Sequence, residues 1–419
     1  MSRNREVAVQ RNGITEGVIW QQILIFFFPI LFGTFFQQLY NTADAIIVGR
    51  FVGKEALSAV GGTTGTLINL LVGFFVGMSS GSSVVVSQYY GAGNAEMVKK
   101  SVHTAFCLAI GGGICLLIIG QIFAPAAILR AVGDSKRPLF FLICACLTNI
   151  VLDILFVVIL KMEVAGAALA TILSQAMAAG LVLITLMRSK ESYRFEIRAL
   201  KMDKMILRKI IQIGLPAGMQ SVMYSVSNIV IQANINGFGT DTIAAWAVFG
   251  KIDGIFWMTM DALSISITTF AGQNFGAGKI DRLKKGTYVG LGMTLTATAI
   301  LATAVYTFGT AISALFTDDP MVLADSMMII KFQAPFWFCY SCVNVFPSTL
   351  RGIGDAFIPM LIICVGTCLL RVVWIFTAGA IRPDLFTTLF SYPLSWSATS
   401  IAFVIYYYRF SAMKKLCKT

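Results

Sequence analysis

Long apolar runs separated by short connectors constrain this sequence more than any other feature. Such runs recur along all 419 residues, and a helix of roughly 20 apolar residues crosses about 30 Å of hydrocarbon. Only 12% of the residues are charged, whereas a typical soluble domain has about 25%. The sequence therefore predicts an all-α, polytopic membrane protein with no separate soluble domain.

Eleven membrane spans are expected from these runs. Their approximate ranges are 18–40 (continuing as helix to about 49), 56–88, 101–124, 138–160, 164–187, 210–236, 243–271, 286–316, 325–348, 359–380 and 386–409. No small-x-small cleavage site follows the first run, so we interpret it as an uncleaved span.

Positive charge gathers in the connectors between the spans. The longest connector, residues 188–209, has eight Lys or Arg residues and three acids. Short positive connectors stay in the cytoplasm, so we expect 188–209 to be a solvated link between an N-terminal lobe (1–187) and a C-terminal lobe (210–419). The net charge of +12 has the same origin, and no nucleic-acid partner is expected.

The sequence also repeats itself in one direction. Ser87-Gln-Tyr-Tyr-Gly-Ala-Gly93 returns 185 residues later as Gly272-Gln-Asn-Phe-Gly-Ala-Gly278. Leu129-Arg-Ala-Val-Gly-Asp134 returns as Leu350-Arg-Gly-Ile-Gly-Asp355, but 221 residues later. Because the offset grows from 185 to 221, the first half lacks about one span and its connector.

The missing segment belongs between Gly93 and Leu129, so we expect a twelve-span architecture without its fourth span. Only one span fits between Lys100 and the basic cluster at Arg130, Lys136 and Arg137. That interval would put positive connectors on both membrane faces. A break or re-entrant path at the glycine triplet 111–113 would restore the orientation, and both termini would then be cytoplasmic. Inversion and loss of activity are the alternatives.

Four polar residues of the first half are expected at similar depth inside the spans. Counting from the outer ends of their runs places Asp44, Asp153 and Thr171 about 9 to 12 Å deep. Asn149 lies one helical turn before Asp153 on the same face. Such a cluster can share a proton between carboxylates or offer oxygen ligands to Na⁺. Structural hydrogen bonding between helices is the alternative interpretation.

The second half breaks this symmetry, because Ile231 stands where Asp44 would recur. The candidates for a substrate cavity are Gln38, Asn41, Lys251, Asp253, Asp261 and Arg371. Ion pairs between helices account equally well for the charged residues of the second half. The nine cysteines are interpreted as buried, inert thiols, even at Cys339-x-x-Cys342, which lies in an expected span without a nearby histidine.

Taken together, these motifs resemble the multidrug and toxic compound extrusion (MATE) family, and within it the bacterial DinF-like branch. The resemblance rests on Asn41-Thr-Ala-Asp44, the two Gln-x-x-Gly-Ala-Gly connectors and the two Leu-Arg-x-x-Gly-Asp connectors. It covers nearly the whole chain except the absent span. It implies two pseudo-symmetric helical lobes in a bacterial cytoplasmic membrane, working as a monomer in the lipid bilayer.

The resemblance further implies export of small organic cations in exchange for H⁺ or Na⁺ by alternating access, with no other cofactor. The implied cation-coupling residues are Asp44, Asn149, Asp153 and Thr171, with Na⁺ at Asp44 and Asp153 as an alternative to a proton. A second family pattern, Glu and Asp in the C-terminal lobe, is absent because Tyr224 and Tyr340 take those places. Protons are therefore favoured.

Three other functions stay open at this point. A lipid-linked oligosaccharide flippase of the related superfamily would carry more cations in its central cavity. A family member without its fourth span could have lost transport. Gly77-Met-Ser-Ser-Gly81 matches Gly-x-Ser-x-Gly, with His103 the sole histidine, but the strand–turn–helix context of a serine hydrolase is missing, so no enzyme is expected.

Overall fold

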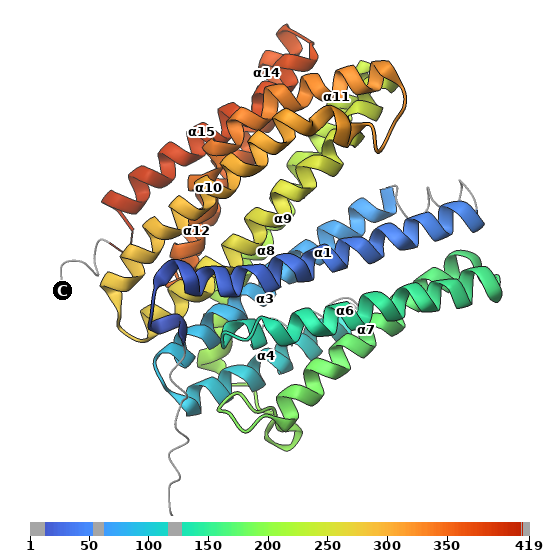
Figure 1. Cartoon of the computed structure of the whole chain (residues 1–419). Coiled ribbons are helices and arrows are strands. Elements are labelled where there is room, and N and C mark those ends of the chain that lie inside the picture. Colours follow the sequence, from blue (N-terminus) through green and yellow to red (C-terminus); the bar gives the residue numbers. More distant parts are fainter. Residues whose placement is uncertain (1–12, 53–62, 116–127, 412, 414–419) are drawn as a thin grey trace, which may run out of the picture. The chain divides into compact units, whose positions relative to one another are not determined.

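The computed structural model describes residues 13–52, 63–115, 128–411 and 413, and every regular element in these ranges is helical (Figure 1). Eight of the described helices are long and apolar enough to cross a membrane. The predicted polytopic all-α class is confirmed. The chain divides into two compact units, Met1–Gly218 with Gly272–Lys279, and Met219–Ala271 with Ile280–Thr419. These units differ in their limits from the lobes 1–187 and 210–419, which stay a prediction.

Most of the expected spans correspond to single helices. These are α1 (Ile19–Phe51), α3 (Thr63–Gly91), α4 (Ala95–Cys115), α6 (Lys136–Asp153), α7 (Glu163–Arg188), α8 (Lys204–Ile235), α9 (Thr240–Gly276), α10 (Ile280–Ser313) and α15 (Leu385–Arg409). Parts of the second and third expected spans, 56–62 and 116–124, lie outside the described residues. The glycine triplet 111–113 lies within α4, so the predicted break is wrong at the triplet itself.

The single helix expected over 325–348 is wrong. This segment consists of α11 (Pro320–Gln333), a 3₁₀ turn η5 (Ala334–Phe336) and α12 (Trp337–Gly352). Pro335 in the turn has no N–H to donate to the preceding helix, and its ring disfavours helical geometry before it. The break therefore has a local cause in the sequence.

Two other spans contain π-helical segments. One is η2 (Ile154–Ile159), which directly follows α6. The other is η6 (Cys364–Leu369), which lies between α13 (Phe357–Ile363) and α14 (Leu370–Ile381). π segments are uncommon and recur at functional sites. Here one begins just after Asp153 and the other ends two residues before Arg371.

In the first unit, α6 packs against both α1 and α7, and the three helices run side by side (Figure 1). Close glycine contacts join α3 to the first half of α8. A Cβ added to Gly77 would overlap the backbone of Gly218, and one added to Gly81 would overlap Gly214. Small residues that let helix backbones approach are typical of membrane proteins. Close packing thus accounts for the Gly-x-Ser-x-Gly match, which lies inside helix α3 and not in a nucleophile elbow.

The repeated Gln-x-x-Gly motifs meet each other in the first unit. A Cβ on Gly91 would overlap the backbone of Gln273, and a Cβ on Gly276 would overlap the backbone of Gln88. The glycine of each motif thus leaves room for the backbone of the glutamine in the other motif. The end of α3 and the end of α9 therefore approach each other closely at two reciprocal contacts.

The same repeated motifs end their helices in the same way. Gly93 and Gly278 have φ of 69° and 70°, and Gly133 and Gly354 have φ of 91° and 96°. The N–H after each glycine donates to a carbonyl five residues earlier, as in Asn94 to Tyr89 and Lys279 to Asn274. This is the Schellman termination, which needs a left-handed residue that glycine supplies without strain.

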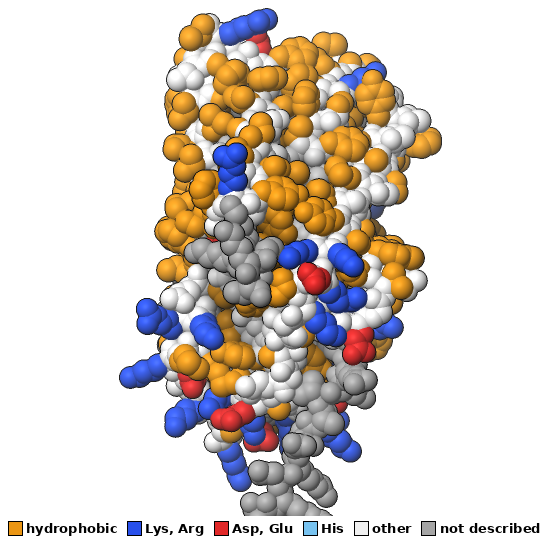
Figure 2. Space-filling model, turned by 90° about the vertical axis from the view of Figure 1, so that its left-hand side faces the viewer, with side chains coloured by type: hydrophobic (Ala, Val, Ile, Leu, Met, Phe, Trp, Pro, Cys, Tyr) orange, Lys and Arg blue, Asp and Glu red, His pale blue; other side chains and the backbone are white. Residues whose placement is uncertain are grey.

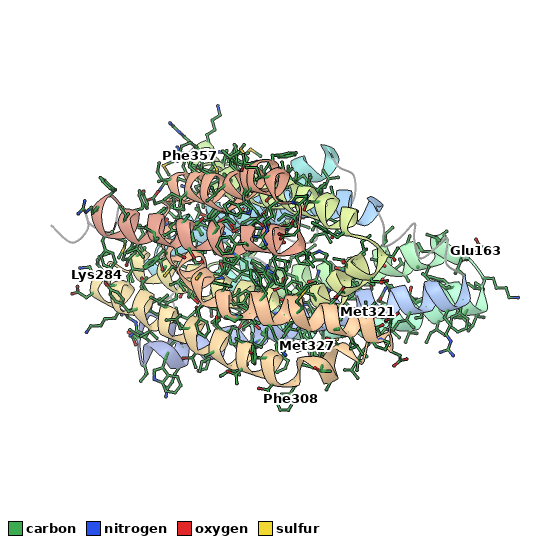
Figure 3. All side chains as sticks on the ribbon, turned by 90° about the horizontal axis from the view of Figure 1, so that it is seen from above. Glu163, Lys284, Phe308, Met321, Met327 and Phe357 are labelled. Carbon is green, nitrogen blue, oxygen red and sulfur yellow. The ribbon has the colours of Figure 1, made fainter. Side chains whose placement is uncertain are left out.

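In the second unit, α12 packs against α10 and α15, and α14 packs against α15. Helix α11 packs against α10, where Met327 lies on Gly309 (Figure 3). Side-chain caps begin two of these helices. Asp319 accepts bonds from the N–H groups of Met321 and Val322, and Asp384 accepts one from Thr387. These acids satisfy helix N-termini.

The connector 188–209 is folded against the first unit and is not simply solvated as expected. The ring of Phe195 lies 4.1 Å from that of Phe106 and 5.5 Å from that of His103, between centroids. Lys99 Nζ donates to Glu196 Oε2 at 2.9 Å, and this bond lowers the pKa of Glu196. Both ring nitrogens of His103 contact backbone atoms of Lys99 and Glu196. His103 therefore anchors the connector to α4.

The basic connectors of the first unit gather at one end. The starts of α1 and α6 and the end of α7 line the same pocket, and Lys279 Nζ donates to the carbonyl of Thr15. The cluster at Lys136 and Arg137 thus lies beside Arg188 at one end of these helices, while their orientation in a membrane stays a prediction. On the face shown in Figure 2, most Lys and Arg side chains lie below a broad hydrophobic zone.

We expect Gly276→Ala to destabilise the protein, because the new methyl group would overlap the backbone of Gln88. Overpacking of this kind costs about 1–3 kcal/mol. Thermal unfolding of the purified protein in detergent measures the effect. Gly292→Ala in α10 is the matched control, since open space surrounds that Cβ position. An unchanged melting temperature for Gly276→Ala would contradict the close crossing.

Candidate functional site

The four polar residues predicted in the first half come from three helices that pack together. Asp44 lies on α1, Asn149 and Asp153 on α6, and Thr171 on α7. Thr171 Oγ1 donates to Asp44 Oδ2 at 3.3 Å and to its own helix at Ala167 O at 3.0 Å. The carboxyl groups of Asp44 and Asp153 interact electrostatically with each other. The structure thus brings both acids and the threonine into one site.

The site holds more acceptors than donors. Asn149 and Asp153 are 0% exposed. Both carboxyl oxygens of Asp153, both polar atoms of the Asn149 side chain and Asp44 Oδ1 are buried without a hydrogen-bond partner. Buried polar groups normally have partners, and those without one are costly. Two carboxyl groups this close cannot both be ionised cheaply, so the arrangement is suited to one shared cation.

A proton or Na⁺ fits this donor set chemically. A proton would lie between the two carboxyl groups. Na⁺ would take hard oxygen ligands from Asp44, Asp153, the amide oxygen of Asn149 and the hydroxyl of Thr171, the ligand type that hard cations prefer. Among the described residues there is no cluster of three or more His, Cys, Asp or Glu side chains that would suit a transition metal.

Two further residues of this site were missed from the sequence. Gln175 Nε2 donates to the hydroxyl of Tyr40 at 2.9 Å, and Tyr40 interacts electrostatically with Asp44. Tyr40 lies four residues before Asp44, and Gln175 lies four residues after Thr171, so each sits one turn away on the same helix face. This four-residue spacing could have predicted that Tyr40 and Gln175 belong to the site.

An apolar cluster closes the site at the end where α1 and η2 end and α7 begins. It consists of buried Val48, Val157 and Ala167, with Ile47 and Val52 packed against them. Val48 lies one turn beyond Asp44, Val157 one turn beyond Asp153, and Ala167 one turn before Thr171. Figure 3 marks Glu163, the first residue of α7, at this end. The carboxyl pair is therefore separated from that end of the helices by side chains that bind no ion.

In the second unit, Asp253 and Arg371 belong to one buried cluster. Arg371 is 2% exposed, and its Nε and Nη2 each donate to Ser395 Oγ at 3.3 Å. Its guanidinium lies over the ring of Tyr392, 4.1 Å from the centroid. Asp253 accepts a 2.6 Å bond from Trp257 Nε1 and interacts electrostatically with Arg371. No salt bridge among the described residues joins the two side chains, so their interaction is a longer-range electrostatic one.

The tryptophan and tyrosine side chains of the second unit pack tightly around this cluster. Trp257, Trp337, Tyr340 and Trp396 form a chain of ring contacts together with Phe256, with centroids 4.5 to 6.3 Å apart. Tyr224 and Tyr340 interact electrostatically, and the buried hydroxyl of Tyr224 has no hydrogen-bond partner. Much of the aromatic content thus packs within this unit, and Arg371 itself occupies the face of Tyr392 that a ligand cation would use.

The other candidates for a substrate cavity are exposed. Gln38 and Asn41 are exposed on α1, and Lys251 and Asp261 are exposed on α9. Asp261 interacts electrostatically with Arg351. Their part in a substrate cavity stays a prediction.

An all-helical chain with duplicated motifs, apolar spanning helices and a buried carboxyl pair among them has the features of a multi-pass membrane transporter. The MatE family model matches residues 29–127 and 216–377, which include most of both repeats. The chain therefore belongs to the MatE family of membrane transporters.

Relatives and solved structures agree with this assignment. The "Probable multidrug resistance protein YoeA" of Bacillus subtilis is 27% identical over 389 residues, covering 82% of this chain and 83% of its own. The "FAD transporter" of Shewanella oneidensis is 25% identical, covering 75% and 78%. A solved "Outward-facing conformation of a multidrug resistance MATE family transporter of the MOP superfamily" aligns over 100% of both chains with a TM-score of 0.87 and 19% identity, which shows the shared fold.

The buried cluster of the second unit generates a prediction about stability. Arg371→Gln removes the buried guanidinium that donates to Ser395 and interacts with Asp253, and leaving buried polar groups unpaired costs about 1–3 kcal/mol. The double variant Arg371→Gln/Asp253→Asn should recover part of this loss, because no uncompensated charge remains. Thermal unfolding of the four proteins of this double-mutant cycle measures the coupling.

Arg382→Gln is the matched control, because Arg382 is exposed and its ion pair with Asp384 lies in a loop. Exposed pairs contribute about 0–1 kcal/mol. Additive effects of the two substitutions at 253 and 371 would contradict the coupling.

Proposed function

We propose that this protein is a multidrug exporter that couples the export of small organic cations to the entry of a proton, or of Na⁺, at Asp44 and Asp153. The single observation that carries the proposal is the interacting pair of carboxyl groups, three of whose oxygens are buried without a hydrogen-bond partner. The names of the relatives support the drug-export part, since several are multidrug resistance or multidrug export proteins.

The charge of the carboxyl pair sets the proposed exchange. With both carboxyl groups deprotonated, the site carries two negative charges, which favours the state that accepts a cationic drug. Entry of a cation between Asp44 and Asp153 removes that attraction and the mutual repulsion, which favours the state that releases the drug outwards. A ligand shifts such an equilibrium only by its different affinity for the two states, and a charge inside the membrane differs strongly in cost between them.

The neighbouring groups have separate parts in this proposal. Thr171 orients the Asp44 carboxyl group through its hydroxyl, and Asn149 offers an amide one turn from Asp153. The apolar cluster at Val48, Val157 and Ala167 keeps ions from crossing while the site is closed. The outer end of the site would open when the side chains of this apolar cluster move apart. Alternating access requires that only one end of the site is open at a time.

The predicted absence of the fourth span does not remove this machinery. All four predicted coupling residues lie on α1, α6 and α7, and these helices pack together as the site requires. This supports an active transporter over a non-transporting relative. We further propose that it acts as a monomer in the bacterial cytoplasmic membrane, with both termini in the cytoplasm, because the basic connectors of the first unit share one end.

Drug resistance in an efflux-deficient bacterial host tests the proposal. Asp44→Asn and Asp153→Asn should each reduce resistance to the level of the empty vector, because an amide cannot exchange a proton. Asp281→Asn, which changes an exposed acid at the start of α10, should leave resistance intact. Full resistance in Asp44→Asn, at a membrane abundance equal to that of the unaltered protein, would refute the proposed coupling.

Proteoliposomes distinguish the two coupling ions. An imposed pH gradient without Na⁺ should drive uptake of a fluorescent organic cation, and Asp153→Asn should abolish it. Uptake that needs a Na⁺ gradient and ignores the pH gradient would assign the site to Na⁺.

A further inference from the structure

A second polar site lies at the basic end of the first unit, where α1 and α6 begin and α7 ends. It is a pocket of about 920 Å³. The cation-coupling residues do not line it. Asp44 is 22 residues further along α1 than Gln22 of the pocket, a distance of about 33 Å along the helix. The pocket is therefore separate from the carboxyl pair.

The mouth of this pocket carries an excess of positive charge. Four cations line it, Lys136, Arg137, Arg188 and Lys190, together with two acids, Asp134 and Glu191. Arg137 is paired with Asp134, at 3.2 Å between Nε and Oδ2. No ion pair among the described residues involves Lys136, Arg188 or Lys190, and all three are exposed. These three charges converge from the ends of two different helices.

The deeper wall of the pocket is apolar. Ile25 and Phe26 of α1, Phe141 of α6 and Ile184 of α7 line it. Phe141 lies one turn further into α6 than Arg137, and Ile184 lies one turn further into α7 than Arg188. Ile25 and Ile184 are 56% and 48% exposed. The pocket thus changes from cationic to apolar in the direction that leads from the membrane surface into the hydrocarbon.

We propose that this pocket binds an anionic glycerophospholipid, with its phosphate on Lys136, Arg188 and Lys190 and an acyl chain against Ile25, Phe141 and Ile184. Basic pockets between spanning helices on the cytoplasmic side are suited to anionic headgroups. The apolar wall selects a lipid over a soluble phosphate, because only a lipid covers the exposed Ile25 and Ile184 at the same time.

The bound lipid would join the helices of the coupling site. Its phosphate connects the start of α6 to the end of α7, and its acyl chain lies against α1. These helices carry Asp153, Thr171 and Asp44, respectively. Anionic lipid is therefore expected to raise the thermal stability of the first unit. This inference does not depend on the proposed drug export, because binding is measured on the purified protein without transport.

Lipid binding by the full-length protein in neutral detergent tests the inference. We expect phosphatidylglycerol to bind, to remain attached in native mass spectrometry and to raise the melting temperature. Arg188→Gln/Lys190→Gln should weaken binding by about fivefold per lost cation, the equivalent of ~1 kcal/mol each. Lys136→Gln, on the other helix, removes one cation and should therefore weaken lipid binding by about fivefold. These side chains are exposed, so the variants should fold.

The controls distinguish a specific lipid-binding site from non-specific electrostatic attraction to the basic surface. Lys201→Gln/Lys204→Gln removes the same charge from exposed positions that do not line the pocket, and it should leave binding unchanged. Phosphatidylcholine should bind weakly, and inorganic phosphate alone should not raise the melting temperature.

Three outcomes would overturn the inference. Equal binding of phosphatidylcholine would show that charge is not recognised. Equal stabilisation by inorganic phosphate would assign the pocket to a soluble anion. Equal loss in Lys201→Gln/Lys204→Gln would reduce the effect to the overall charge of this surface.

Discussion

Two carboxyl groups buried against each other are the constraint on which the rest of this structure depends. Asp44 and Asp153 come from helices that would pack more cheaply with apolar side chains at these positions, because an ionisable group inside a span is costly. The hydroxyl of Thr171 satisfies one oxygen, while five other polar atoms of the site are buried without a hydrogen-bond partner. A proton or Na⁺ is the physical complement that such a set of acceptors suits. In the proposed function, the apolar cluster one turn away decides from which end a cation reaches the pair.

The duplicated sequence motifs supply the scaffold that holds these helices. Their glycines have two separate tasks, since Gly91 and Gly276 admit a neighbouring backbone and Gly93 and Gly278 end the helices in a left-handed conformation. Both tasks exclude a side chain, for steric and conformational reasons respectively. Backbone geometry therefore explains the motif, whereas the carboxyl pair that we propose for ion coupling is not repeated in the second half.

Apolar run length and charge placement were sufficient to predict the helical class, most helix limits and the convergence of Asp44, Asp153 and Thr171. Run length and charge placement did not predict the features that depend on local backbone effects or on tertiary packing. The 3₁₀ turn at Pro335 and the π segments change the helix locally without changing its hydropathy. The folded connector depends on Phe195 meeting Phe106 and His103, a contact between distant residues. The reciprocal glycine contacts likewise need coordinates, because the repeat shows that the motif matters but not what it touches.

Proton release on drug binding tests the central claim most directly. The purified protein in weakly buffered detergent is mixed with an organic cation that it binds, and a pH indicator records the protons released. The account predicts close to one proton released per bound drug by the unaltered protein, and none by Asp44→Asn/Asp153→Asn. Drug binding that releases neither a proton nor Na⁺ would contradict the claim that the carboxyl pair holds a cation that the drug must replace.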